Sequence, residues 1–123
     1  MNDLYDKIDA SLSMLRLTPE ASEYTLHRQI ASAFATAGLA YEREASICPG
    51  CRVDFLIEGA VILEVKRGKP PLKRLTAQLE RYARSQKAMR IYLLVERSAR
   101  IPERIGGVDV KVVSLNSLWG IAI

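Results

Sequence analysis

Apolar positions at the start of the chain follow the period of a helix. They are spaced four, four and three residues apart and so share one helix face: Leu4, Ile8, Leu12 and Leu15. A second helix is predicted from Thr18, a good N-terminal cap that is followed by Pro19, to about Ala37. Gly38 should end it, because glycine suits the conformation that follows a helix. The N-terminal part of the chain therefore predicts two amphipathic helices.

Beyond Leu39 the apolar period changes to that of strands. Strands are predicted at residues 41–47, 52–57 and 60–66. The dipeptides that separate them, Pro49-Gly50 and Glu58-Gly59, are typical of tight turns. The third strand is apolar on both faces until Glu64. This pattern is typical of a central strand in a sheet that is covered on both sides.

The second half of the chain alternates helix and strand. A helix is predicted at residues 71–86, and strands follow at residues 90–95 and 108–113. Three hairpin-connected strands followed by a crossover helix predict an α/β fold, with a central mixed sheet of about five strands flanked by helices. We expect a single domain over residues 1–123, in which residues 1–17 form a helix that precedes the core. The apolar tail, residues 118–123, should pack onto this core or onto a second subunit.

The composition indicates an ordinary globular domain. Of the 123 residues, 49% are hydrophobic and 26% are charged, so the chain can fold without a metal or disulfide staple. No apolar run in the sequence reaches the roughly 18–20 residues that span a bilayer. The N-terminus carries Asp3 and Asp6 where a signal peptide would carry bases. These features predict a cytoplasmic protein without a membrane partner.

The two cysteines, Cys48 and Cys51, stand on either side of the Pro49-Gly50 turn. They lack further partners for a zinc site, because His27 is the chain's single histidine and such a site needs about three or four ligands. A redox pair is expected at a helix start, whereas this pair flanks a hairpin. We expect two free thiols, and a disulfide across the turn is the alternative.

Positive charge is concentrated in one stretch of the sequence. Residues 66–90 contain nine bases and a single acid, Glu80. This stretch therefore carries +8 in a chain whose net charge is +4, and the remainder is net negative. A concentrated basic surface favours a polyanionic partner such as nucleic acid. The structural alternative is a solvated helix face.

Two acids and a lysine are predicted to meet at the end of the third strand. Glu64 and Lys66, two residues apart, share one face of that strand, and Asp54 on the preceding strand can lie beside Glu64. Such charges are costly to bury unless they are paired or bound to metal. Carboxylates, completed by water and phosphate oxygens, are the ligands that Mg²⁺ prefers. An exposed ion pair at a strand end is the alternative.

Other polar residues could join this cluster. Glu23 falls on the apolar stripe of the second helix, where a carboxylate needs a partner; a salt bridge with His27 or Arg28 is the alternative. Gln78 and Tyr82, four residues apart, share one face of the later helix; helix packing together with solvent contact is the alternative.

In this order the residues resemble the PD-(D/E)XK nuclease superfamily, which includes the small archaeal-type Holliday junction resolvases. The resemblance covers about residues 20–95 and rests on four places in the sequence: Glu23 and residues 52–57, 62–66 and 78–82. Val53 stands where the family name has proline. The resemblance implies a restriction-endonuclease-like core and a Mg²⁺-dependent nuclease in which Mn²⁺ can replace Mg²⁺.

The resemblance also implies roles for individual residues. The metal would be held by Asp54 and Glu64, with the backbone carbonyl of Val65 nearby. Lys66 would orient water as a cation, or act as a base if burial made it neutral. The catalytic set implied by the resemblance is Glu23, Asp54, Glu64, Lys66 and Gln78. Nucleic-acid contacts are expected from Arg67, Lys69, Lys73, Arg74, Arg81, Tyr82 and Arg84.

The substrate is expected to be DNA rather than RNA by family analogy alone. The chain is too short for a separate specificity domain, so we expect recognition of DNA shape or ends over a long sequence. A homodimer joined through the N-terminal helix or the apolar tail would be one way to recognise such a shape or end. Two rival functions are a catalytically silent module that binds nucleic acid or serves as an assembly subunit, and a small redox module that uses Cys48 and Cys51.

Overall fold

The computed structural model describes residues 2–15, 22–68, 71–96 and 100–115. The chain divides into two compact units, Met1–Tyr41 with Asn116–Ile123, and Glu42–Leu115. No helix in the described ranges is long and apolar enough to cross a membrane. The predicted tail at residues 118–123 and Lys69 lie outside the described residues.

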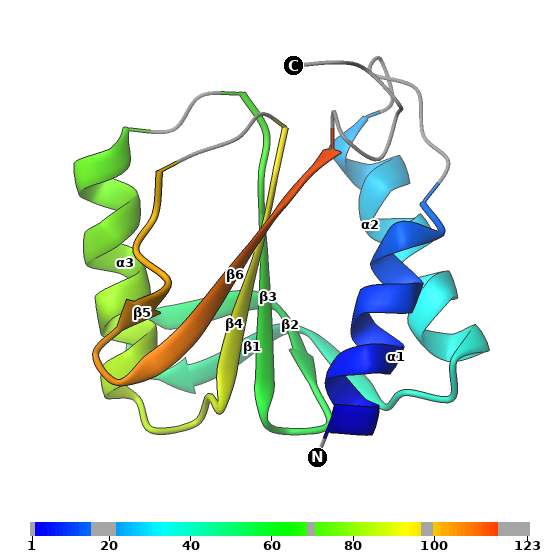
Figure 1. Cartoon of the computed structure of the whole chain (residues 1–123), viewed down its shortest axis with the longest axis horizontal. Helices are drawn as coiled ribbons and strands as arrows, with labels where there is room; N and C mark the ends of the chain where they lie inside the picture. Colours follow the sequence, from blue (N-terminus) through cyan, green and yellow to red (C-terminus); the bar gives the residue numbers. More distant parts are fainter. Residues whose placement is uncertain (1, 16–21, 69–70, 97–99, 116–123) are drawn as a thin grey trace. The chain divides into compact units, whose positions relative to one another are not determined.

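The first unit contains two helices that pack against each other, α1 (Asn2–Ser13) and α2 (Glu23–Thr36) (Figure 1). The predicted apolar face of α1 is confirmed, since Ile8, Leu12 and Leu15 are buried and Leu4 is half-buried. The apolar face of α2 is also confirmed: it buries Leu26, Ile30 and Phe34, whereas Ala37 is half-buried. The cap of α2 is Ser22, whose hydroxyl accepts a hydrogen bond from the Thr25 backbone N–H at 3.1 Å. The helix thus begins at Glu23, later than the sequence pattern at Thr18 predicts. The serine oxygen satisfies one of the free N–H groups of the first turn, and the acid that follows it interacts favourably with the helix dipole.

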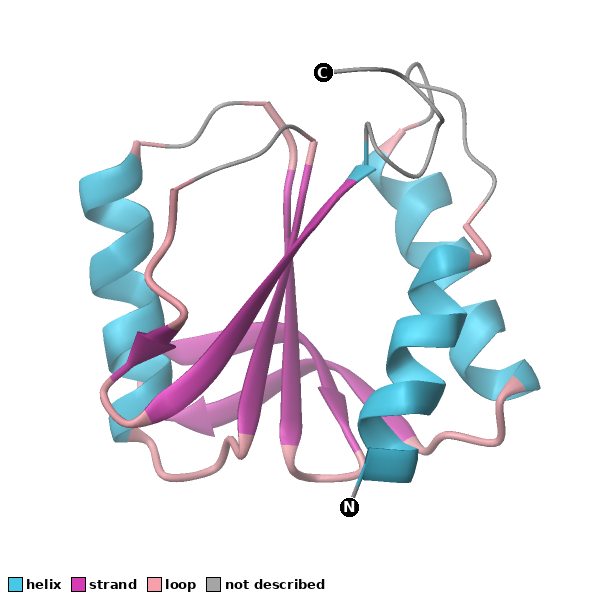
Figure 2. Ribbon diagram, in the orientation of Figure 1, coloured by secondary structure: helices cyan, strands magenta, loops and turns pink. Residues whose placement is uncertain are grey.

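The second unit is built on a mixed sheet, which confirms the predicted α/β class (Figure 2). Its strand order is β1-β2-β3-β4-β6-β5. The strands are β1 (Tyr41–Cys48), β2 (Cys51–Ile57), β3 (Val61–Lys66), β4 (Arg90–Val95), β5 (Arg104–Ile105) and β6 (Val108–Ser114). Neighbours β2 and β3 are antiparallel, β4 is parallel to both β3 and β6, and β5 is antiparallel to β6. The sheet has one strand more than the five or so that the sequence predicts. The additional strand is β5, whose two residues are too few to show the period of a strand.

Helix α3 (Leu72–Arg84) connects β3 to β4 and covers one face of the sheet (Figures 1 and 2). Its apolar stripe is buried in one cluster with side chains of the strands, and the helix members of that cluster are Leu75, Leu79 and Tyr82. The central position predicted for β3 is confirmed, because all of its residues except Lys66 are buried. The end of β3 therefore lies beside a basic helix, and this arrangement positions the candidate site.

The turn between β5 and β6 passes very close to α3 at Gly106. A Cβ atom at this position would lie 2.9 Å from the Cβ of Ala83, and the backbone φ is +58°. We expect Gly106→Ala to lower the free energy of unfolding by about 1–3 kcal/mol, because it adds both a clash and left-handed strain. Urea unfolding measures this. Gly107→Ala, with φ +82° but open space around the new Cβ, is the control and should cost less; equal costs would show that the close approach is unimportant.

Candidate functional site

The site begins where backbone pairing between β2 and β3 stops. Pairing runs from Ile57–Val61 to Phe55–Leu63, one residue short of Asp54 and Glu64. Beyond this pair of residues, hydrogen bonds from side chains join the two strands in place of backbone–backbone hydrogen bonds. The Asp54 backbone N–H donates to Glu64 Oε1 at 3.1 Å, and the Val65 N–H donates to Asp54 Oδ2 at 2.7 Å. The two carboxylates are thereby fastened to each other's strands, and we call them the carboxylate pair.

A slip in the alternation of β2 accompanies this opening. Val53 and Leu56 both pack in the cluster under α3, although they are an odd number of residues apart. Successive side chains of a regular strand point to opposite faces, so the alternation shifts by one residue between them. Asp54 lies within this interval. A local irregularity of this kind can end regular pairing and re-aim a side chain, which fits the end of the β2–β3 pairing at Phe55.

Glu64 is a buried acid, with 5% of its surface exposed. Burial, followed by the negative charge of Asp54, raises its pKa from 4.5 to about 7. The hydrogen bond from the Asp54 backbone and the charge of Lys66 act in the opposite direction. The Lys66 Nζ lies 3.4 Å from Glu64 Oε2. Two neighbouring carboxylates of this kind attract a cation when both are ionised.

Tyr82 is the part of the site that the sequence pattern placed wrongly. Its side chain is buried, with 1% of the residue exposed, so it is not available for the direct nucleic-acid contact that we expected. Its hydroxyl lies 3.3 Å from both Glu64 Oε2 and the Arg52 carbonyl oxygen and can donate to either. Burial, followed by the charge of Glu64, raises the pKa of Tyr82, so the hydroxyl keeps its proton and remains a donor.

A groove of about 310 Å³ runs beside Lys66 along α3. Its polar lining is mostly basic and comes from Lys66, Arg74, Gln78 and Arg81. The apolar lining comes from Pro71, Leu75 and Ala77. Gln78 therefore lies in the groove with Lys66. The remaining predicted bases of α3, Lys73 and Arg84, are exposed.

Two of the predicted phosphate-binding bases already have partners within the protein. Arg67 Nε donates to Glu96 Oε1 at 2.9 Å, and both side chains are partly buried. Arg81 donates from Nη2 to the Gly50 carbonyl oxygen at 2.8 Å. An arginine has five N–H donors, so the bond from Arg81 Nη2 leaves other donors of that side chain for phosphate. The neutralised Arg67 should contribute less to nucleic-acid binding than the exposed bases of α3.

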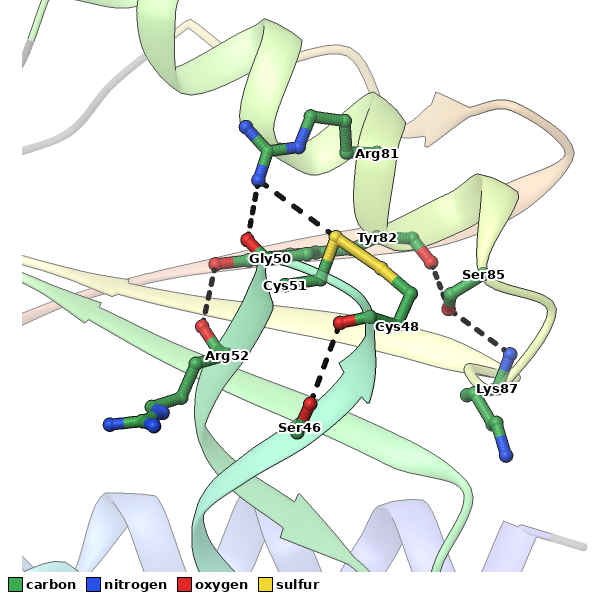
Figure 3. The surroundings of a disulfide bond; sticks show 9 residues. All are labelled: Ser46, Cys48, Gly50, Cys51, Arg52, Arg81, Tyr82, Ser85 and Lys87. Atoms are coloured by element: carbon green, nitrogen blue, oxygen red, sulfur yellow. Dashed lines mark hydrogen bonds between the residues drawn. A yellow bond between two sulfur atoms is a disulfide. The ribbon is translucent and has the colours of Figure 1, made fainter.

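The two cysteines form a disulfide, so the expectation of free thiols is wrong and its alternative is correct (Figure 3). The hairpin turn brings the Cα atoms of Cys48 and Cys51 to 5.0 Å, within the range that a disulfide bridges. The bond lies against α3, where Arg81 approaches both Gly50 and the Cys51 sulfur (Figure 3).

Glu23 belongs to the first unit and is the first residue of α2. Its side chain is 64% exposed and lies 3.9 Å from His27 Nε2, so the expectation that it faces the core is wrong. Glu23 has the helical spacing that would align it with the apolar positions of α2, but the first buried residue of that helix is Leu26. The salt bridge with His27, weighed as the alternative, fits this geometry. A metal-binding or catalytic role for Glu23 stays a prediction.

The donor set suits Mg²⁺ better than a soft or borderline metal. No group of three or more histidine, cysteine, aspartate or glutamate side chains that could hold a metal occurs in the described ranges. Mg²⁺ needs only one or two carboxylates, because water and phosphate oxygens complete its shell. The carboxylate pair meets that requirement, and a divalent cation would favour the ionised form of Glu64, whose pKa is raised by burial and then by the charge of Asp54. In comparisons with known proteins, the chain matches no family model, no curated protein and no solved structure.

Proposed function

We propose that this protein is a Mg²⁺-dependent nuclease with a restriction-endonuclease-like core, which hydrolyses phosphodiester bonds of DNA. The observation that supports this most is the carboxylate pair itself. The Glu64 carboxylate accepts the backbone N–H of Asp54 and the Asp54 carboxylate accepts that of Val65, at the end of a central strand beside Lys66 and a basic groove. Burial, followed by the charge of Asp54, raises the pKa of Glu64 and so costs stability at neutral pH; holding a cation for chemistry on a polyanion would account for that cost.

In this proposal Asp54 and Glu64 hold the ion, with the Val65 carbonyl as a further oxygen nearby. When bound, Mg²⁺ would supply a Lewis acid for the phosphate and lower the pKa of a coordinated water. The task of the protein is then to place the scissile phosphate next to the pair. The groove beside Lys66 is suited to that task, because its polar lining is three cations and an amide.

Lys66 is proposed to act as a cation. It lies between Glu64 and the groove, 3.4 Å from Glu64 Oε2, with 27% of its side chain exposed. From that place its ammonium group can orient the attacking water and stabilise negative charge that develops on the phosphate. Gln78, which also lines the groove, can donate a hydrogen bond to a phosphate oxygen without adding charge.

The substrate is proposed to be held mainly through its phosphates. Lys73, Arg74 and Arg84 are exposed on the helix beside the groove. Contacts of this kind do not read sequence. They weaken as the salt concentration rises, because releasing counterions from the nucleic acid then gains less free energy. We therefore expect preference for a DNA shape or end. A DNA rather than RNA substrate remains an inference from resemblance.

The proposal is tested by cleavage of linear, single-stranded, supercoiled and four-way-branched DNA, with Mg²⁺ and with EDTA. Wild type and Lys66→Ala are compared, and Lys87→Ala, an exposed lysine beyond the end of α3, is the matched control. We expect cleavage by wild type and Lys87→Ala in Mg²⁺ only, and at least a tenfold slower rate in Lys66→Ala. Binding without cleavage on all four forms would instead indicate a catalytically silent nucleic-acid module.

A further inference from the structure

The Tyr82 hydroxyl spans the opening between β2 and β3. On β2 it lies 3.3 Å from the Arg52 carbonyl oxygen, and on β3 it lies 3.3 Å from Glu64 Oε2. Both distances are long for an O–H···O bond, as expected where one proton is shared between two acceptors. We propose that Tyr82 is a positioning residue, which holds the Glu64 carboxylate in the orientation that receives the cation. The benefit to cation binding rests on the proposed function.

Glu64 is held from both ends of its carboxylate. Oε1 accepts the backbone N–H of Asp54 at 3.1 Å, and Oε2 lies near the hydroxyl of Tyr82 and the ammonium of Lys66. These donors differ in stiffness. The backbone N–H and the tyrosine are fixed, whereas Lys66 ends a flexible four-carbon chain that is partly exposed. The rotation of the carboxylate is therefore set by Asp54 and Tyr82.

The tyrosine can serve as a rigid donor because its ring is part of the core. Tyr82 is 1% exposed and packs in the cluster with Leu79 and Ile62. Its position four residues after Gln78 on α3 means that one helix carries both a groove residue and the residue that fixes the buried acid. Hydrogen bonds to a metal ligand from a neighbouring residue orient that ligand, and their loss typically weakens metal binding about 10–100-fold.

A purely structural tyrosine would make the same packing contacts without controlling Glu64. Tyr82→Phe separates the two roles, because it keeps the ring and deletes the hydroxyl. In metal-free protein we expect the Asp54 amide to exchange with solvent at least about fivefold faster in this variant, since its acceptor, Glu64 Oε1, is no longer fixed. Amides of the intact ladder, at Leu63 and Leu93, should not change.

The second measurement is the Mg²⁺ dissociation constant by titration calorimetry at one fixed pH. We expect it to rise about tenfold in Tyr82→Phe. Tyr92→Phe is the matched control, because Tyr92 is equally buried on β4 while its neighbours Ile91 and Leu93 face the α3 cluster. By strand alternation Tyr92 points to the other face. This control should leave both the Asp54 amide and the Mg²⁺ affinity unchanged.

The exchange rate of the Asp54 amide tests the role of Tyr82 independently of Mg²⁺ binding. Unchanged exchange at Asp54 in Tyr82→Phe would overturn the positioning role, and so would an equal acceleration at Leu63, which would indicate general destabilisation. Wild-type protein that fails to bind Mg²⁺ would instead refute the proposed function. Faster exchange confined to Asp54 would then still support Tyr82 as the residue that holds Glu64.

Discussion

Asp54→Asn is expected to lower the rate of Mg²⁺-dependent DNA cleavage by at least about a hundredfold. Asparagine keeps the size of the side chain and an oxygen that can accept from the Val65 N–H, now at 2.7 Å from Asp54 Oδ2. The fold of the hairpin should therefore persist. What is lost is one of the two negative charges that hold the ion, and removing one group that stabilises charge in the transition state typically costs 10²–10³-fold. Initial rates at saturating Mg²⁺ measure the effect.

The control for this variant is Asp109→Asn. Asp109 lies on β6 in the same unit, and its exposed carboxylate is paired with Arg104 at 2.7 Å. The same chemical change there removes a surface ion pair, which is worth little. We expect wild-type cleavage from it. Full cleavage by a correctly folded Asp54→Asn would show that the carboxylate pair serves only to join β2 and β3. The nuclease proposal would then be abandoned.

The sequence predicts the carboxylate pair well because hairpin geometry is local. Asp54 and Glu64 lie equally far from Gly59 in the turn, so continued pairing brings them opposite each other on one face. The period of two in β3 places Lys66 beside Glu64 for the same reason. The helices and the α/β class follow from equally local periods. These features depend on spacing, which the sequence shows directly.

Other features depend on which partner a side chain finds. The sequence presents the bases of residues 66–90 as equivalent, yet Arg67 pairs with Glu96 and Arg81 with the Gly50 carbonyl. Such pairings join segments about thirty residues apart, and no local period predicts them. The buried hydroxyl of Tyr82 belongs to the same class. Its place on the apolar stripe with Leu79 is the signal that it faces inward.

Glu64→Gln is expected to stabilise the metal-free protein at pH 8 by up to about 3 kcal/mol. The pKa of Glu64 is about 7 in the folded protein and 4.5 as the reference value, so the folded state binds more protons between these pH values. Its contribution to stability is therefore fully present below about pH 4.5 and is lost as pH rises through about 7. Each pKa unit is worth about 1.4 kcal/mol. Glutamine is neutral throughout and should remove this loss, while it also removes a metal ligand.

The test is urea unfolding of wild type and Glu64→Gln in EDTA at several values between pH 5 and pH 8. The difference between the two should grow with pH and level off above about pH 8, and Glu80→Gln, on the exposed side of α3, should track wild type. Parallel pH profiles for all three proteins would mean that Glu64 does not titrate in this window.

Adding Mg²⁺ in place of EDTA should stabilise wild type but not Glu64→Gln, because a ligand that binds only the folded state raises the stability of that state. A buried acid that destabilises the free protein and is relieved by a cation is the behaviour expected of a site kept for function.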